Sequence, residues 1–179
     1  KILQEEQLDY GTTPTYKGET PTREPSAQYT YTFKGWDYAI SPVRGKFTYN
    51  AVFDKTLNTY LIRFENYDKT ELDTNTVAYG EMPNYYGENP KKESTDPAYR
   101  YVFAGWEPSL TIVTGDATYT ATYIQELNIF HVDAVSDDVN KGTVTGSGDY
   151  QAGSVATLTA QPKKGYALDY WSNGEKTAS

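Results

Sequence analysis

The hexamer "YTFKGW" occupies residues 31–36, and it recurs in altered form as "YVFAGW" at 101–106 and as "YALDYW" at 166–171. The shared pattern is an aromatic residue, an apolar residue two positions later and a tryptophan three positions after that. No nucleophile, base or metal ligand has a fixed place in this pattern. A repeated element without a reactive group indicates a structural role. The residues predicted to form the cores are Tyr31, Phe33, Trp36, Tyr101, Phe103, Trp106, Tyr166, Leu168 and Trp171.

The hexamers belong to a longer internal repeat. "YGTTPTYKGETPTRE" from Tyr10 matches "YGEMPNYYGENPKKE" from Tyr79, and "TYNAVF" at 48–53 matches "TYTATY" at 118–123. The repeat is therefore about 70 residues long, which is enough for a small domain. The sequence predicts a first unit at 1–57 that lacks its first strand, a complete unit at 58–126 and a divergent unit at 127–179 that lacks its last strand.

The unit junctions are predicted at the two Leu-Asn pairs, in the short connections "DKTLN" and "IQELN". The segment from Asn58 to Gln125 contains every predicted strand, so it is expected to fold alone, whereas 1–57 is not. Both ends of the sequence are expected to continue into a longer array. An incomplete terminal unit would present an unpaired strand edge, which a strand of another chain could cover.

Alternation of apolar and polar residues predicts the strands. In "TYLIRFEN" the residues Tyr60, Ile62 and Phe64 share one face, and in "TYTATY" the residues at 119, 121 and 123 do so. The third unit is expected to place 130, 132 and 134 likewise, with further strands in "GTVTG" and "SVATLTA". Prolines in "KGETPTREPSAQ" and "YGENPKKESTDP" oppose long helices there. The predicted fold class is mainly β, with tandem small β-grasp-like domains, four-stranded sheets, Pro-rich crossing segments and little helix.

Trp36 follows Phe33 by three positions, so a regular strand would place the two side chains on opposite faces. Gly35 and Gly105, which directly precede the tryptophans, are predicted to host a β-bulge that returns the indole to the core. The third unit has Tyr170 in place of this glycine.

Composition excludes several function classes. The net charge of −8 opposes binding to nucleic acid and to anionic membrane surfaces. The sequence has no cysteine, so it has no disulfides and no thiolate metal site. No apolar run approaches the roughly 20 residues of a membrane helix, and no signal peptide opens the sequence. A signal and an anchor are expected outside these residues, and no membrane insertion is expected within them.

Candidate chemical residues are few. His131 is the only histidine, and it is either a general base or a strand residue that faces solvent. The repeat does not preserve a carboxylate pair of the kind that glycosidases use. Oxygen-bearing side chains at 133, 137, 138 and 140 form either a calcium loop or a polar hairpin turn. We therefore predict no catalytic residues, no cofactor and no metal site, and we expect that the chain is not an enzyme.

Three tyrosines in the crossing segments have two interpretations. Tyr16, Tyr85 and Tyr86 either form a ligand-binding surface for glycan or protein, or cap the small cores with their hydroxyl groups in water.

The first two units resemble the Listeria–Bacteroides repeat, also called the internalin B-type B repeat. The resemblance is carried by an alternating first strand followed by Y-G-x-x-P, F-x-G-W and T-Y-x-A-x-[FY]. The third unit is similar to the divergent B-repeat family through "GTVTGSGDYQAGSVATLTAQPKKGYALDYW". The resemblance implies a β-grasp-like sheet in each unit, no catalytic residues, and a location on the bacterial cell surface.

The expected function is that of a non-catalytic stalk or spacer in an extracellular surface protein, with a role in adhesion. The alternative is a module that binds a glycan or a host protein through its tyrosines.

Overall fold

All regular secondary structure in the described part of the chain is β-strand. The structure is a computed structural model that describes residues 1–176, and within them no helix occurs. The strands of these residues are β1 (Tyr29–Trp36), β2 (Ala51–Leu57), β3 (Thr59–Glu65), β4 (Glu71–Ala78), β5 (Tyr99–Glu107), β6 (Ala117–Leu127), β7 (Ile129–Val132), β8 (Gly142–Thr145), β9 (Gly148–Gln151) and β10 (Thr159–Pro162). The prediction of a mainly β protein is confirmed. None of the described residues forms a helix that could span a membrane.

The chain divides into two compact units. The first consists of Lys1–Glu88 with Trp106–Ala121, and the second consists of Asn89–Gly105 with Thr122–Ser179. β1 to β4 belong to the first unit, and β7 to β10 belong to the second. The three repeat copies of the sequence (1–57, 58–126 and 127–179) are called copies one, two and three below, and their status as separate domains stays a prediction.

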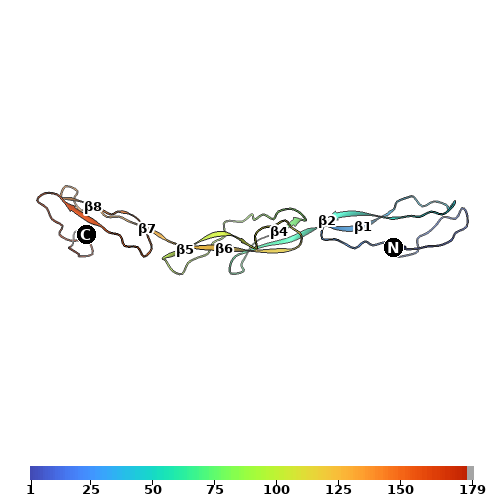
Figure 1. The fold of residues 1–179 in the computed structure, drawn as a ribbon, viewed down its shortest axis with the longest axis horizontal. Coiled ribbons are helices and arrows are strands. Elements are labelled where there is room, and N and C mark those ends of the chain that lie inside the picture. Colours follow the sequence, from blue (N-terminus) through green and yellow to red (C-terminus); the bar gives the residue numbers. More distant parts are fainter. Residues whose placement is uncertain (177–179) are drawn as a thin grey trace. The chain divides into compact units, whose positions relative to one another are not determined.

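β1 and β2 form an antiparallel pair in the first unit (Figure 1). The register shifts by one residue between Phe33 and Gly35, which is a β-bulge. Gly35 has φ 143°, a conformation that disfavours residues with a side chain. The bulge places the Trp36 ring 5.6 Å from the Phe33 ring, on the same side of the strand. The bulge predicted from the hexamer is therefore confirmed here, and Gly105 has a similar φ of 133°.

A four-stranded sheet has the order β4-β3-β6-β5. β3 pairs with β4 in antiparallel fashion from Thr59 opposite Ala78. On its other side β3 pairs with β6 in parallel, from Ile62 opposite Ala117 to Glu65 opposite Thr120. β3 is therefore an inner strand with a hydrogen-bonded neighbour on each side.

The hydrophobic core gathers around β3. Ile62 and Phe64 are 0% exposed, and Val113 and Tyr119 are 3% exposed. Tyr60, Tyr85 and Trp106 are among the half-buried residues that pack against this cluster. The predicted alternation of β3 is confirmed, and so is that of β6, in which Tyr119 and Ala121 are buried.

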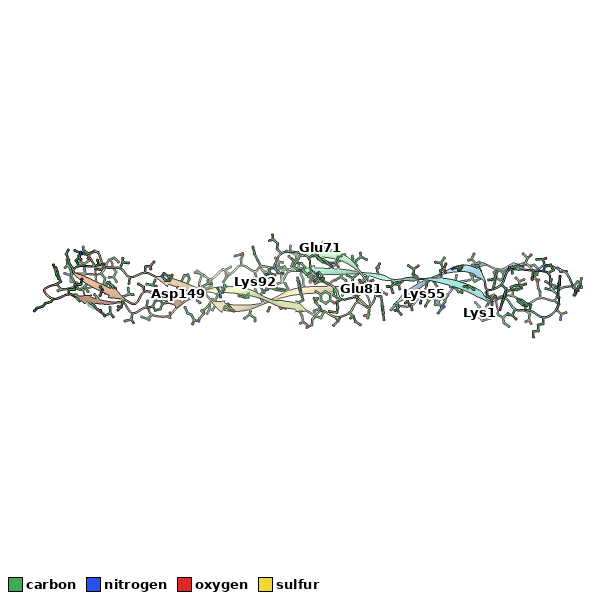
Figure 2. All side chains as sticks on the ribbon, turned by 90° about the horizontal axis from the view of Figure 1, so that it is seen from above. Lys1, Lys55, Glu71, Glu81, Lys92 and Asp149 are labelled. Carbon is green, nitrogen blue, oxygen red and sulfur yellow. The ribbon has the colours of Figure 1, made fainter. Side chains whose placement is uncertain are left out.

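Copy one lacks such a core. Among the described residues other than proline, every buried hydrophobic side chain lies between positions 62 and 121, and Pro21 is the buried residue of copy one. Residues 1–9, whose counterparts in copy two include β4, form no strand. Charged side chains such as Lys55 and Glu71 are exposed and project from the thin sheets (Figure 2).

The second unit contains two further strand pairs, β7 with β9 and β8 with β10. Three details differ from the sequence prediction. Phe130 is 50% exposed, whereas Val132 and Ala134 of the same expected face are half-buried. "SVATLTA" is a strand only from Thr159 onwards. Residues 166–171 form no strand and Tyr166 is 54% exposed, while Leu168 and Trp171 are half-buried. Without a paired partner strand, this third hexamer does not repeat the packing of the first two.

The connections between copies are also shorter than predicted. β2 extends to Leu57 and β6 extends to Leu127, so "DKTL" and "IQEL" are strand. Only Asn58 separates β2 from β3, and only Asn128 separates β6 from β7.

The two matched tryptophans test the role of the core. Trp106 lies 4.8 Å from the Phe64 ring, whereas in copy one Trp36 contacts Tyr16 and Phe33. Trp106→Ala should lower the free energy of unfolding around β3 by about 3–5 kcal/mol, as large core truncations do. Trp36→Ala should lower the free energy of unfolding around β1 by clearly less, because no counterpart of Phe64 packs on Trp36. Amide exchange of each strand measures both effects, and equal losses would contradict this account of the core.

Candidate functional site

The strongest candidate for a functional element is the junction between repeat copies, and Asn58 forms the first one. Its backbone N–H donates to the carbonyl of Gln28 at 2.9 Å, and its own carbonyl accepts from the N–H of Tyr79 at 2.9 Å. Its amide Nδ2 donates to the carbonyls of Ser26 and Ala27 at 2.8 and 3.0 Å. Asn58 thus joins the loop before β1 to the end of β4.

Asn128 forms the second junction with nearly the same bonds. Its N–H donates to the carbonyl of Ala98 at 2.8 Å, and its carbonyl accepts from the N–H of Ala152 at 2.8 Å. Its Nδ2 donates to the carbonyls of Pro97 and Tyr99 at 2.8 and 3.1 Å. Asparagine suits this position because its side chain donates two hydrogen bonds while its backbone donates and accepts.

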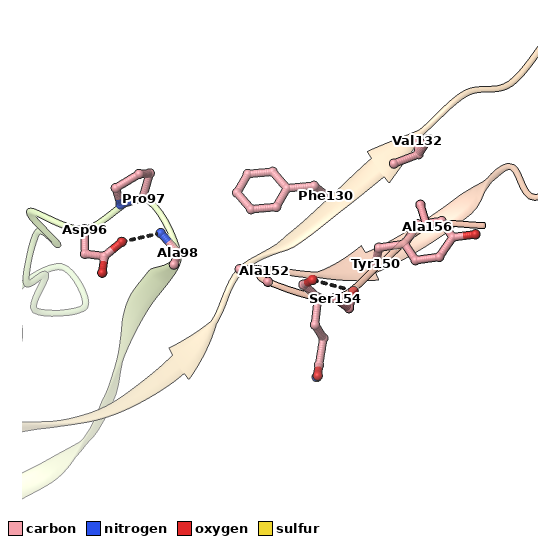
Figure 3. A pocket seen from close by; sticks show the side chains of 11 residues that line it. Asp96, Pro97, Ala98, Phe130, Val132, Tyr150, Ala152, Ser154 and Ala156 are labelled. Carbon is pink, nitrogen blue, oxygen red and sulfur yellow. Dashed lines mark hydrogen bonds between the residues drawn. The ribbon is translucent and has the colours of Figure 1, made fainter. Parts of the chain in front are cut away.

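The junctions differ at the second residue of the following strand. At the first junction, the Tyr60 hydroxyl donates to the carbonyl of Ala27 at 2.6 Å. The counterpart at the second junction is Phe130, which has no hydroxyl. Phe130 instead lines an open hollow of about 370 Å³ together with Pro97, Ala98 and Tyr150 (Figure 3).

A second motif of the repeat, Y-x-G, occurs at residues 16–18 and 85–87 in the crossing segments, and the packing of its tyrosine explains its glycine. Tyr85 packs its ring 5.0 Å from Trp106, and its hydroxyl donates to the carbonyl of Glu88 at 2.7 Å. A Cβ at Gly87 would collide with the Tyr85 hydroxyl group. In copy one a Cβ at Gly18 would collide with Tyr16 in the same way. Burial, together with the nearby carboxylates of Asp73 and Glu88, raises the pKa of Tyr85.

The crossing segment of copy two is tied to β4 by polar side chains. Asp73 accepts from the backbone N–H of Tyr86 at 3.2 Å, and Asn75 donates to the carbonyl of Asn84 at 3.2 Å.

In copy one a single residue, Gln4, makes both of the matching bonds. It accepts from the N–H of Lys17 at 2.8 Å and donates to the carbonyl of Thr15 at 3.0 Å. The crossing path is therefore preserved in both copies.

The three tyrosines proposed as a ligand surface do not lie together. The Tyr16 ring is 5.2 Å from Trp36, and Tyr85 packs against the core with its hydroxyl bonded to the carbonyl of Glu88. Tyr86 is 77% exposed and is the one of the three that faces solvent.

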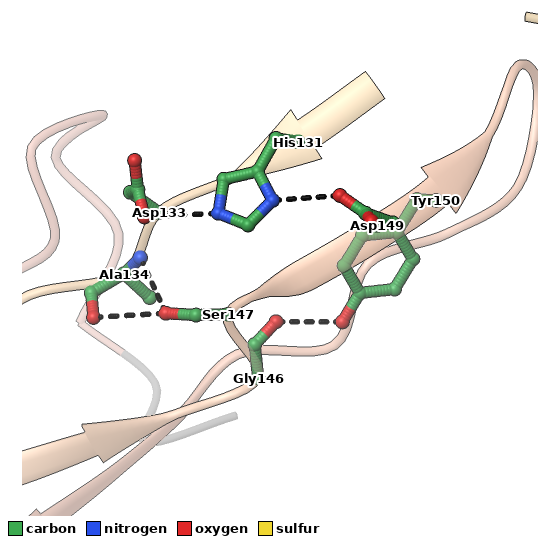
Figure 4. A network of polar contacts seen from close by, with 7 residues as sticks. All are labelled: His131, Asp133, Ala134, Gly146, Ser147, Asp149 and Tyr150. Carbon is green, nitrogen blue, oxygen red and sulfur yellow. Dashed lines mark hydrogen bonds and ion pairs between the residues drawn. The ribbon is translucent and has the colours of Figure 1, made fainter. Parts of the chain in front are cut away.

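His131 has two carboxylate partners that the sequence did not reveal. Its Nδ1 lies 2.7 Å from Asp149 on β9, and its Nε2 lies 3.2 Å from Asp133 (Figure 4). All three side chains are exposed. The hydrogen bond with Asp149 raises the pKa of His131, and the nearby negative charge of Asp133 raises it further. Asp149 is reached through the register of β7 and β9, which pairs residue 131 with 149.

The acidic loop of the third copy forms a turn. Asp138 accepts from the N–H of Asn140 at 2.9 Å through its side chain, and its carbonyl accepts from the N–H of Lys141 at 3.0 Å. Asp133 lies instead beside His131. Among residues 1–176, no group of three or more histidine, cysteine or acidic side chains could hold a metal ion.

Comparison with known proteins identifies one related domain. A family model described as the divergent InlB B-repeat domain matches residues 134–179, the last three of which lie outside the described residues. No curated protein and no solved structure matches the chain. The match supports the B-repeat family for the third copy and is compatible with a repeat segment of a surface protein. The resemblance of the first two copies stays a prediction.

Reciprocal variants test the junctions. Tyr60→Phe removes the bond to Ala27 and should destabilise the first junction by about 1 kcal/mol, the usual net value of such a bond. Phe130→Tyr offers the matching hydroxyl at the second junction and should stabilise it by a similar amount. Amide exchange at Asn58 and Asn128 measures the two effects. Effects of the same sign in both variants would contradict the equivalence of the junctions.

The histidine cluster predicts a pH dependence of the β7–β9 pair. Because the folded-state pKa of His131 is raised above its ordinary value of 6.5, protonation stabilises the pair. This stability is complete below pH 6.5 and is lost as the pH rises through the folded-state pKa. A titration of the imidazole followed by NMR should show the raised pKa, and Asp149→Asn should lower it. High salt should weaken the effect, because the charges are exposed. An unchanged pKa in Asp149→Asn would contradict the assignment.

Proposed function

We propose that this chain is a non-catalytic repeat segment of a bacterial cell-surface protein and acts there as a stalk or spacer. Support comes from the divergent B-repeat match at residues 134–179 and from the internal repeat of the preceding residues. The proposed location is extracellular. Adhesion would be the task of the protein as a whole, through contacts with a host protein or glycan, without nucleic acid or membrane insertion at these residues.

We infer further that each complete unit is β-grasp-like and that the units are arranged in tandem. The order β4-β3-β6-β5, with β3 and β6 parallel at its centre, supports this inference. A Pro-rich segment occupies the crossing between β4 and β5. Residues 58–126 contain all four of these strands, apart from the last residue of β6.

The observation that carries the spacer role is the asparagine junction. A connection of one residue has almost no slack, whereas long Gly- and Ser-rich linkers behave as flexible coils. Asn58 and Asn128 also fix the adjoining backbone on both sides through hydrogen bonds. A repeat built this way transmits direction and load from one copy to the next, which a spacer requires.

Glycine variants of the junction test this role. Asn58→Gly and Asn128→Gly keep the chain length but remove the side-chain bonds, and glycine adds backbone freedom. ¹⁵N relaxation should show larger independent motion of the flanking strands in both variants. Asn140→Gly, which lies in a turn away from the junctions, is the matched control and should leave this motion unchanged.

Unchanged relaxation in both junction variants would contradict the stiff spacer. A separate glycan-array screen of the full chain addresses the alternative function, and binding that Tyr86→Ala abolishes would favour a ligand-binding module.

A further inference from the structure

Two cationic side chains lie over neighbouring tyrosine rings on the β1–β2 pair. Tyr29 and Tyr31 share one face of β1, and their ring centres are 6.4 Å apart. The guanidinium carbon of Arg23 lies 3.9 Å from the centre of the Tyr31 ring. The ammonium group of Lys55 lies 4.5 Å from the centre of the Tyr29 ring. Cation–π attraction therefore holds two positive charges at adjacent places on this strand pair.

These two cations differ from others of the chain because they have no carboxylate partner. Both side chains are exposed, and among residues 1–176 neither forms an ion pair. By contrast, Lys17, Lys34 and Arg100 each contact a carboxylate oxygen at 2.8 or 2.9 Å. The chain has 24 acidic residues for 16 Lys and Arg, so a shortage of carboxylates does not explain the difference. The N–H donors of Arg23 and Lys55 are therefore available to an anionic ligand.

The two tyrosines add polar groups to the same place. Within the described part of the chain, the hydroxyl groups of Tyr29 and Tyr31 make no hydrogen bond, and neither oxygen is buried. The hydroxyl groups of Tyr60 and Tyr85, by contrast, donate to backbone carbonyls. A phenol hydroxyl both donates and accepts, so Tyr29 and Tyr31 can bond to hydroxyl groups of a ligand.

We propose that Arg23, Lys55, Tyr29 and Tyr31 form a binding site for an acidic glycan, called the cation–tyrosine site below. The cations bind carboxylate or sulfate groups of the glycan, and the phenol hydroxyls bond to hydroxyl groups of its sugars. The planar fork of arginine matches the geometry of such oxyanions. The site is additional to the spacer role and does not rest on it.

Charge and chemistry favour a glycan over other anionic ligands. Duplex nucleic acid carries one charge per about 1.7 Å, and the net charge of −8 opposes such a dense polyanion. An acidic peptide supplies carboxylates, but Asp and Glu side chains have no hydroxyl group to pair with Tyr29 and Tyr31. An acidic glycan has sparser charges with hydroxyl groups between them, which matches the groups that the site offers.

Copy two repeats only half of this arrangement. The ammonium group of Lys92 lies 4.1 Å from the centre of the Tyr101 ring, in the same way as Arg23 lies over its ring in copy one. The counterpart of Lys55 is Gln125, which has no charge. Copy one is therefore the expected place of binding, because it has both cations.

The test titrates the full chain with a hexasaccharide of galacturonic acid and follows the amide signals of β1 and β2 by NMR. A sulfated neutral hexasaccharide distinguishes sulfate from carboxylate recognition, and its unsulfated form should not bind. Arg23→Gln and Lys55→Gln should each weaken binding about tenfold, as expected for a hydrogen bond to a charged group. Lys34→Gln is the matched control, because it removes the same charge from β1 at a residue paired with Asp54, and it should leave the affinity unchanged.

A second variant separates binding from folding. Tyr29→Phe combined with Tyr31→Phe keeps both rings under their cations and removes only the hydroxyl groups. It should leave amide exchange of β1 and β2 unchanged and weaken glycan binding, while hexaglutamate should bind the unaltered chain poorly.

Three outcomes would overturn the cation–tyrosine site. They are the absence of binding of both acidic hexasaccharides, equal weakening by Lys34→Gln, and binding of hexaglutamate as tight as that of the glycan, which would assign the surface to an acidic protein segment. None of these outcomes bears on the relaxation of the junction variants, so failure of the site and failure of the spacer role are distinguishable.

Discussion

Burial of the Ile62 and Phe64 side chains is the constraint on which the rest of the described core depends. Both belong to β3, which lies between β4 and β6 in the sheet. Each of these side chains contributes roughly 1.5–3 kcal/mol by leaving water, and small units have few other apolar groups to bury. Phe64 contacts the rings of Tyr85, Trp106 and Tyr119, so it joins the crossing segment, β5 and β6. Gly105, with φ 133° directly before Trp106, and Gly87, which lies against Tyr85, adjoin two of the aromatic rings that contact Phe64.

A second constraint acts where one copy ends and the next begins. Strands on both sides of Asn58 need hydrogen-bond partners at their last residues, and a one-residue connection leaves no loop to supply them. The asparagine itself bonds backbone groups beside the neighbouring strands: the carbonyls of Ser26, Ala27 and Gln28 before β1, and the N–H of Tyr79 after β4. The same residue recurs 70 positions later at Asn128, where its backbone and its amide make corresponding bonds and one side-chain acceptor differs. The Leu-Asn pair of the repeat is therefore explained by backbone satisfaction and not by a ligand.

Alternation made β3 and β6 predictable, because a buried face leaves a period of two in the sequence. β4 was harder to predict, since "ELDTNTVA" is largely polar and becomes a strand by pairing with β3. The extent of β2 and β6 was underestimated for the same reason, as polar strand ends resemble connections. Among the candidate site residues, the packing of Tyr85 could be recognised only from the position of Trp106. The Asp149 partner of His131 could be recognised only from the pairing register of β7 and β9. Both depend on contacts between distant residues, which spacing along the chain does not reveal.

Residues 2–9 and 71–78 occupy equivalent places in the repeat, yet only the second segment is a strand. Local preference does not account for this difference, because Ile2 and Leu3 are at least as compatible with a strand as Glu71 and Leu72. The difference lies in pairing, since β4 pairs with β3 whereas no strand among the described residues pairs with residues 2–9. The turns, the asparagine junction and the crossing segment depend on bonds between nearby residues. They form in copy one although it lacks the core around Phe64. The path of the chain through the turns and the crossing segment is therefore fixed by local bonds, while the strand character of residues 71–78 depends on their pairing with β3.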